Sequence, residues 1–136
     1  MVISGFSVRP VEGLPEVDEG FNLGAAIANL TGLASGDVVA ISQKVVSKAE
    51  GRSVGLGSID PGQEAGSLAQ ELGKDPRLVE LILREATSVV RTDPERGILI
   101  TETRHGFICA NSGIDASNVA GEDIVLLLTE DADASA

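Results

Sequence analysis

The sequence has 136 residues and a formal net charge of −11, with 21 acidic residues against 10 basic ones. This charge argues against a nucleic-acid backbone or an anionic membrane as the main partner, because both bind basic surfaces. Hydrophobic residues make up 43% of the chain, with three Phe and no Tyr or Trp, so its core must be aliphatic.

The sequence contains no signal-peptide pattern and no apolar stretch near the roughly 18 residues that a membrane-spanning helix needs. Its single cysteine, Cys109, allows no intramolecular disulfide, which fits a reducing compartment. We therefore expect a cytoplasmic protein whose partners include neither nucleic acid nor membrane.

The first elements in chain order are a strand, a loop, a helix and a second strand. Loose alternation indicates a strand over residues 2–8, and two prolines with a glycine indicate a loop over residues 9–16. Apolar residues at helical spacing predict a helix over residues 23–30, with Asn22 as its N-cap. The β-branched run Val38-Val39-Ala40-Ile41 predicts a buried central strand.

Two helices and several short strands follow. One helix is predicted over residues 62–72, and the next starts at Pro76 after the N-cap Asp75. Short apolar runs predict strands at residues 53–56, 98–101, 107–110 and 124–128. The acidic tail, residues 129–136, is expected to fray. These elements indicate a single domain of the α/β class (mixed α+β), with a mixed sheet and about three helices.

A basic segment follows the predicted central strand. Lys44, Lys48 and Arg52 lie within nine residues, in a chain with only ten basic residues. A loop that leaves a central strand is a common place for a ligand, so one interpretation is a phosphate or nucleotide clamp. The other interpretation is a solvated basic face, which the spacing alone favours.

The run from Gly113 to Asn118 follows a short predicted strand and contains one carboxylate, Asp115. It could hold a metal ligand and a hydrogen-bonding side chain, or it could be an Asx-turn, which its residue types favour. The only histidine, His105, is expected in a turn, and Cys109 is expected to pack as a small hydrophobe.

Several runs of this chain occur together, in the same order, in one protein family. They are Val11-Glu12-Gly13-Leu14-Pro15, Gly36-Asp37-Val38-Val39, Lys44 to Arg52, Ile100 to Gly106, and Gly113 to Val119. With these runs the chain resembles the coenzyme F-420-0:L-glutamate ligases, also called gamma-glutamyl ligases. The resemblance covers nearly the whole chain but only the N-terminal half of the family.

The resemblance implies an enzyme that uses GTP and a divalent metal, Mg²⁺ or Mn²⁺, to attach L-glutamate to the deazaflavin cofactor. GTP would phosphorylate the terminal carboxylate of the acceptor, and the glutamate amine would then attack the acyl phosphate. Such phosphoryl transfer depends on charge neutralisation and alignment. The family also implies a homodimer.

The resemblance also assigns roles to residues of this chain. The residues that would contact GTP are Gly13, Leu14, Pro15, Glu16, Gln43, Lys44, Lys48 and Asn118, with Lys48 on a phosphate. Asp115 would be a ligand of the divalent metal. No residue is assigned as a catalytic acid, base or nucleophile.

One departure from the family concerns its second metal-binding run, Ile-Thr-Asp-Thr, which does not occur in this chain. We therefore expect residues 1–128 to form a ligase-like N-terminal domain, with residues 129–136 as an acidic tail where the C-terminal half would begin. The corresponding hypothesis is a ligase part that is inactive alone and needs a C-terminal partner. The alternative is a non-catalytic nucleotide-binding or assembly module on the same fold.

Overall fold

The computed structural model describes residues 5–116 and 123–136. Its helices are α1 (Leu23–Leu30), α2 (Gln43–Ala49), α3 (Gln63–Leu72), α4 (Pro76–Glu85) and α5 (Ala132–Ser135), with 3-10 turns η1 (Leu56–Ser58) and η2 (Asn111–Gly113). Its strands are β1 (Ser53–Gly55), β2 (Ala86–Asp93), β3 (Ile98–Thr103), β4 (Ile108–Ala110) and β5 (Ile124–Leu126). The predicted mixed α/β class is confirmed.

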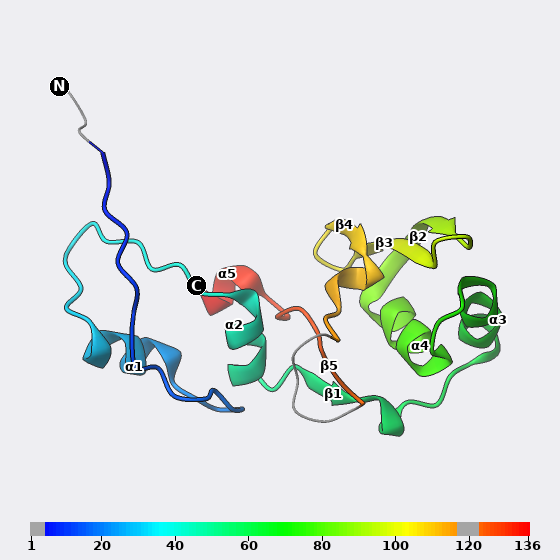
Figure 1. The fold of residues 1–136 in the computed structure, drawn as a ribbon, viewed down its shortest axis with the longest axis horizontal. Helices are drawn as coiled ribbons and strands as arrows, with labels where there is room; N and C mark the ends of the chain where they lie inside the picture. The colour runs from blue at the N-terminus through cyan, green and yellow to red at the C-terminus, as the bar shows by residue number, and fades with distance from the viewer. Residues whose placement is uncertain (1–4, 117–122) are drawn as a thin grey trace.

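The strands of the described residues form two small antiparallel sheets instead of the expected mixed sheet. The first pairs β1 with β5, and the second has the order β2-β3-β4 (Figure 1). In the larger sheet Thr101 lies opposite Val89 on one side and Cys109 on the other. Consecutive strands of the larger sheet are joined by turns, whereas β1 and β5 are separated in the chain by α3, α4 and the larger sheet. Because all these pairs are antiparallel, none needs a crossover connection.

Local start and stop signals explain why three helices lie where the sequence predicts them. The Asn22 side chain accepts a hydrogen bond from the Ala25 amide and caps α1. The Asp75 side chain accepts one from the Arg77 amide, with Pro76 at the first position of α4. Gly73 ends α3 in the left-handed region, with φ of +63°.

The predicted central strand over residues 38–41 is wrong. These residues are in no strand. Val38 is 92% exposed and Ile41 is 41% exposed. The predicted strand over residues 2–8 fails in the same way at its described residues, where Phe6 is 92% exposed. A β-branched run becomes a buried strand only when a neighbouring strand accepts its backbone hydrogen bonds, and none does so in the described chain.

Two further differences lie near element ends. The helix that begins at Pro76 ends at Glu85, and a strand that the sequence did not predict, β2, begins at Ala86. The tail that was expected to fray instead forms α5, whose Ser135 hydroxyl donates to a Glu50 carboxylate oxygen. In both places a tertiary partner, β3 or α2, decides the conformation.

The core lies under α3 and α4, where two aliphatic clusters meet. One cluster contains Ala65, Ala69, Leu72, Val79, Ile82 and Leu99, and the other contains Leu56, Leu81, Val125 and Leu127. Ile82 and Leu99 are fully buried, which contributes about 1.5–3 kcal/mol for each side chain. No helix within the described ranges is long and apolar enough to cross a membrane.

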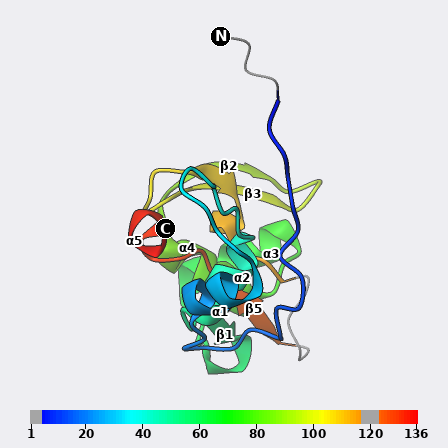
Figure 2. The ribbon, with the colours of Figure 1, turned by 90° about the vertical axis from the view of Figure 1, so that its left-hand side faces the viewer.

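We call residues 63–114 the body, because they contain α3, α4 and the three-stranded sheet. We call residues 5–41 the N-terminal arm, which contains α1 and two extended segments. Figure 1 shows the body at one end and the arm at the other, with α2, α5 and the β1–β5 pair between them. In Figure 2 the first described residues run as an extended trace away from the other elements.

Candidate functional site

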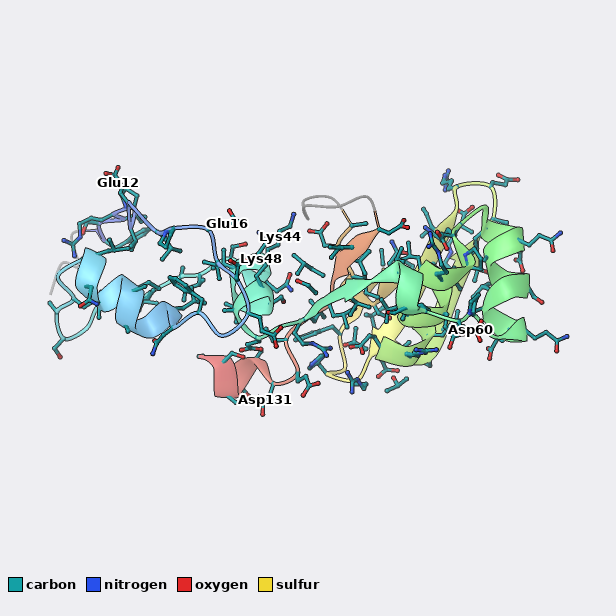
Figure 3. All side chains as sticks on the ribbon, turned by 90° about the horizontal axis from the view of Figure 1, so that it is seen from below. Glu12, Glu16, Lys44, Lys48, Asp60 and Asp131 are labelled. Carbon is teal, nitrogen blue, oxygen red and sulfur yellow. The ribbon has the colours of Figure 1, made fainter. Side chains whose placement is uncertain are left out.

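The predicted basic segment is a helix, α2, and not a loop. Lys44 and Lys48 are four residues apart, so they lie on one face of this helix. This face borders a cleft of about 270 Å³, whose opposite wall is formed by the loop residues Leu14, Pro15, Glu16 and Val17. Figure 3 shows the labelled side chains of Glu16, Lys44 and Lys48 gathered at α2. Residues that are far apart in the sequence, and that are predicted to contact the same nucleotide, therefore line one cleft.

Both lysines of the cleft are paired with carboxylates from other segments. The Lys48 ammonium donates to Glu16 Oε1, which joins α2 to the arm. The Lys44 Nζ lies 2.6 Å from Asp115 Oδ2, which joins α2 to the segment after η2. The hydrogen bond and the charge of Lys48 lower the pKa of the Glu16 carboxyl below its ordinary value. An anion that enters the cleft would therefore meet two ammonium groups held in place by carboxylates, and would compete with those carboxylates for them.

The loop that faces the lysines depends on Gly13. Its φ of +83° lies in the left-handed region, where a side chain is strained. A Cβ atom built at Gly13 would lie 3.6 Å from Leu30 Cδ2, so space alone does not exclude a side chain. The left-handed backbone conformation, and not a lack of space, thus explains why residue 13 is a glycine.

Asp115 is positioned by an unusual turn at the end of β4. Asn111, Ser112 and Gly113 all have positive φ, at 52°, 53° and 71°. The buried Ser112 hydroxyl donates to the Ile82 carbonyl, 3.0 Å away, and lies 2.8 Å from Thr101 Oγ1. Left-handed non-glycine residues cost about 1 kcal/mol or more each, so this buried network holds a strained turn in place.

The residues after this turn complete the placement of Asp115. A Cβ at Gly113 would lie 2.9 Å from Leu128 Cδ1, so only glycine fits without movement. The Asp115 amide donates to the Leu126 carbonyl, and the Leu126 amide donates back, at 2.9 and 2.8 Å. The backbone of Asp115 is therefore fixed to β5, and its side chain reaches α2.

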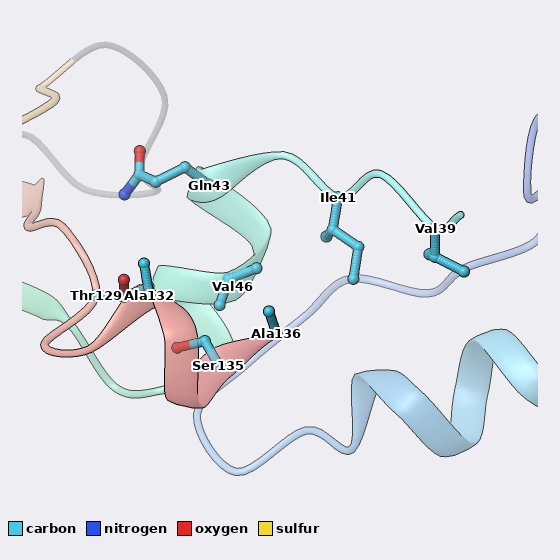
Figure 4. Close-up of a pocket in the computed structure, with 8 residues that line it drawn as sticks. All are labelled: Val39, Ile41, Gln43, Val46, Thr129, Ala132, Ser135 and Ala136. Carbon is cyan, nitrogen blue, oxygen red and sulfur yellow. The ribbon is translucent and has the colours of Figure 1, made fainter. Parts of the chain in front are cut away.

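Gln43 is predicted to contact nucleotide, but it does not line the cleft that Lys44 and Lys48 border. Its side-chain amide donates to the Ser47 hydroxyl and to the Leu127 carbonyl. It borders a second cavity, of about 360 Å³, between α2, α5 and the extended residues Val39 and Ile41 (Figure 4). The structure thus separates Gln43 from Lys44. The predicted nucleotide contact Asn118 lies outside the described residues.

Sequence reasoning missed the ion network around Arg52. Its guanidinium donates to the Leu128 carbonyl at 2.8 Å and to Glu85 Oε2 at 3.0 Å, and it pairs with Glu130. Glu85 also pairs with Arg104, and the Arg52 and Glu85 side chains are only 15% and 14% exposed. Arg52 therefore does not share the cleft with the lysines, but joins the segment between α2 and β1 to α4 and to the residues after β5. No local signal marks Glu85, because its partners are distant in sequence.

His105 and Cys109 take the structural positions expected for them. The His105 ring nitrogen Nε2 lies 2.9 Å from the Glu130 carbonyl, in the turn between β3 and β4, and the ring stacks on Phe107. Cys109 is a partly buried residue of β4. Neither residue lines the cleft.

The donor chemistry at Asp115 does not by itself fit a resident divalent metal. A stable site of this kind usually recruits several oxygen ligands. Among residues 5–116 and 123–136, no three His, Cys, Asp or Glu side chains converge as a metal site. The Asp115 carboxylate is also engaged by the Lys44 ammonium. The described residues therefore offer a divalent metal one carboxylate, which the Lys44 ammonium already contacts, and not a complete ligand set.

Comparison with known proteins identifies the class to which this fold and cleft belong. A family model described as F420-0:Gamma-glutamyl ligase matches residues 13–136, and the chain belongs to this family. The match begins at Gly13, the residue before the loop that lines the cleft, and includes Lys44 and Lys48. The resemblance inferred from the sequence runs is thus confirmed.

Individual relatives are named coenzyme F420:L-glutamate ligase. The chain is 48% identical over 129 residues to that of Methanopyrus kandleri, covering 95% of this chain and 50% of that protein. It is 41% identical over 137 residues to that of Methanothermobacter thermautotrophicus, covering 97% and 53%. It is 41% identical over 132 residues to that of Halobacterium salinarum, covering 93% and 51%. The chain spans about half the length of the curated relatives it matches.

Proposed function

We propose that this chain forms the nucleotide-binding part of a GTP-dependent ligase that joins L-glutamate to the deazaflavin cofactor F-420-0. The observation that carries the proposal is the cleft in which Lys44 and Lys48 face the loop of residues 14–17. Two ammonium groups on one helix face can bind neighbouring phosphate groups of a nucleotide. Membership in the ligase family supplies the reaction class.

The proposed reaction begins with phosphoryl transfer from GTP to the terminal carboxylate of the acceptor. The glutamate amine then attacks the acyl phosphate, an amide bond forms, and phosphate leaves. In this scheme Lys48 and Lys44 neutralise phosphate charge, and the Gly13–Glu16 loop bounds the nucleotide. Mg²⁺ or Mn²⁺ would supply further charge neutralisation when bound, with Asp115 as one contact.

The first test is binding of GTP to the purified full chain by isothermal titration calorimetry, in the presence of Mg²⁺. Lys48→Met should weaken the affinity about tenfold, the effect of losing one charged hydrogen bond of about 1.5 kcal/mol. Lys74→Met is the matched control, because Lys74 follows α3 and is the third of only three lysines. Equal losses in both variants, or none in Lys48→Met, would contradict the phosphate role.

The second test is ligation itself. Because the described residues supply a single carboxylate at the proposed metal position, we expect GTP binding without steady-state glutamate ligation by this chain alone. Mass spectrometry of the deazaflavin product measures this directly. Turnover by the purified chain would show that its own residues complete the site. Binding without turnover would also be the behaviour of the alternative, a non-catalytic nucleotide-binding module, and restored turnover on adding a C-terminal ligase half would separate the two.

We also propose that the chain associates as a homodimer through its arm. Phe6 and Val38 are each 92% exposed, and the cavity in Figure 4 is lined by further apolar side chains. Apolar surface of this kind is typical of interaction sites. Light scattering should therefore give the mass of two chains, and Val38→Asp should shift it toward one. A single monodisperse monomer for the unsubstituted chain would contradict this proposal.

A further inference from the structure

The two carboxylates that pair with the lysines of α2 lie differently with respect to the cleft. Glu16 is one of the residues that line the cleft, and its carboxylate accepts a hydrogen bond from the Lys48 ammonium on the opposite wall. Asp115 pairs with Lys44 but is not among the described residues that line the cleft. Of the two lysines, Lys48 is therefore the one whose negative partner belongs to the cleft itself.

The two carboxylates also differ in how firmly they are held. The side chain of Glu16 is 78% exposed, whereas that of Asp115 is 26% exposed. The backbone of Asp115 is fixed by two hydrogen bonds with Leu126. An exposed ion pair is weak, because water and salt screen its attraction and holding two long side chains together costs entropy. The Glu16 carboxylate can therefore leave its lysine at low cost by turning toward solvent.

The cleft wall has attachments to the molecule besides the Glu16 carboxylate. The next residue, Val17, is only 5% exposed. Three residues further on, the Gly20 amide donates to the Ala49 carbonyl of α2, 2.8 Å away. Burial of an apolar side chain and a backbone hydrogen bond do not depend on the charge of a neighbouring side chain. We therefore expect the loop to stay in place when the carboxylate of Glu16 is removed or turns away.

A carboxylate on Lys48 occupies the place that any other anion would take there. The hydrogen bond and the charge of Lys48 lower the pKa of the Glu16 carboxyl, so this group is negatively charged at neutral pH and cannot donate to a phosphate oxygen. We propose that Glu16 is a built-in competitor for Lys48, and that a phosphate group binds this lysine only when the Glu16 carboxylate turns away from it. This inference rests on the proposed function, which places phosphate groups of the nucleotide at Lys48 and Lys44.

A supporting role of Glu16 predicts the opposite response to substitution. If Glu16 held Lys48 in position for a ligand, its removal would loosen the ammonium and weaken the binding of an anion. If Glu16 competes with the anion, its removal strengthens that binding. The sign of the change therefore separates the two roles.

The experiment is a calorimetric titration of the purified full chain with inorganic pyrophosphate, at neutral pH and low ionic strength because salt screens exposed charges. Glu16→Gln should lower the dissociation constant about threefold, the size expected when one exposed ion pair no longer has to be broken. Glu12→Gln is the matched control. It removes the same charge from an exposed position of the arm, away from both lysines in Figure 3, and should leave the dissociation constant unchanged.

Two further variants show whether the gain acts through Lys48. Glu16→Ala also removes the amide oxygen that glutamine could still offer to the ammonium, so its gain should be at least as large. The double variant Lys48→Met, Glu16→Gln should bind pyrophosphate no more tightly than Lys48→Met, because the gain requires the lysine. In the unsubstituted chain, the ¹³C carboxyl signal of Glu16 should shift when pyrophosphate is added.

Several outcomes would overturn the proposal. They are an equal or weaker affinity in folded Glu16→Gln and Glu16→Ala, an equal gain in Glu12→Gln, or no binding of pyrophosphate by any form of the chain. Pyrophosphate carries no nucleoside, so a failure of GTP to bind would refute the proposed function and leave a gain for pyrophosphate standing. Conversely, GTP binding with no gain in the Glu16 variants would overturn this inference alone.

Discussion

The body buries several of its large aliphatic side chains completely, whereas the N-terminal arm leaves most of its own exposed. Ile82 and Leu99 of the body are fully buried. In the described part of the arm, Val17 and Ile27 are the buried hydrophobic residues, and Phe6 and Val38 are 92% exposed. The difference follows from the elements: the body packs two helices on a three-stranded sheet, while the arm has one short helix and no strand pairing in the described residues.

This comparison shows that most of the buried core and the loop that bounds the cleft belong to different parts of the molecule. The body supplies the buried area, and its end at η2 positions Asp115. The arm supplies Glu16 and the loop that closes the cleft, with little burial of its own. Substitutions in the body should therefore change the free energy of unfolding, and substitutions in the arm should change the cleft.

The largest effect is expected from Ile82→Ala in the body. It removes a fully buried side chain and should lower the free energy of unfolding by about 3–4 kcal/mol. Val38→Ala in the arm should change it by less than about 0.5 kcal/mol. Urea denaturation at low protein concentration, where association is negligible, measures both. A comparable loss for Val38→Ala would mean that the arm packs as tightly as the body.

The next largest effect concerns the ion network of Glu85, in α4 of the body. It joins the body to Arg52, which follows α2, and through Arg52 to the residues after β5. Glu85→Gln leaves the Arg52 and Arg104 guanidinium groups close together without their shared carboxylate. We expect a loss of about 2 kcal/mol in unfolding free energy, below the value for fully buried pairs because some solvent reaches the site. Glu95→Gln, at an exposed turn residue, is the control and should be nearly neutral. Equal melting temperatures for the two variants would contradict a structural role for the network.

Two glycines with positive φ allow a smaller and sharper comparison. Gly113→Ala in the body adds a Cβ 2.9 Å from Leu128 Cδ1, while Gly36→Ala in the arm meets no atom within 4 Å. Both incur backbone strain, with φ of +71° and +96°, so Gly36→Ala should cost about 1 kcal/mol and Gly113→Ala about 2 kcal/mol. Thermal unfolding of both variants measures the difference. If the arm variant proved the more damaging, the packing at Leu128 would not be as rigid as the structure implies.

The smallest effect is the pH response of the pair that joins the arm to α2. The pKa of Glu16 is lowered by its hydrogen bond to Lys48, so the pair is fully formed above the ordinary carboxyl pKa of 4.5. Its stabilisation is lost as the pH falls through the lowered pKa, because protonation removes the negative charge. Carbon-detected titration of Glu16 should give a midpoint below 4.5, and Lys48→Met should return the midpoint toward it. An unchanged midpoint in the variant would show that the pair does not persist in solution.

Much of the site could be predicted because it is carried by short runs. The glycine-proline loop and the lysines of α2 each belong to a short run of the sequence, and the structure places the two runs on opposite walls of one cleft. Gln43 could not be separated from Lys44 by sequence, because neighbours on a helix point about 100° apart and only packing decides which faces the cleft. The nucleotide roles of these residues and of Asn118, and the metal role of Asp115, remain predictions.

The sequence by itself determined the helix boundaries at Asn22, Gly73 and Asp75, because capping depends on residues only a few positions apart. It also determined the family, since ordered short runs identify relatives without any fold. The tertiary structure alone decided that residues 38–41 are not a strand and that Lys44 meets Asp115. Strand formation and ion pairing depend on partners distant in the chain, and no local pattern contains the position of those partners.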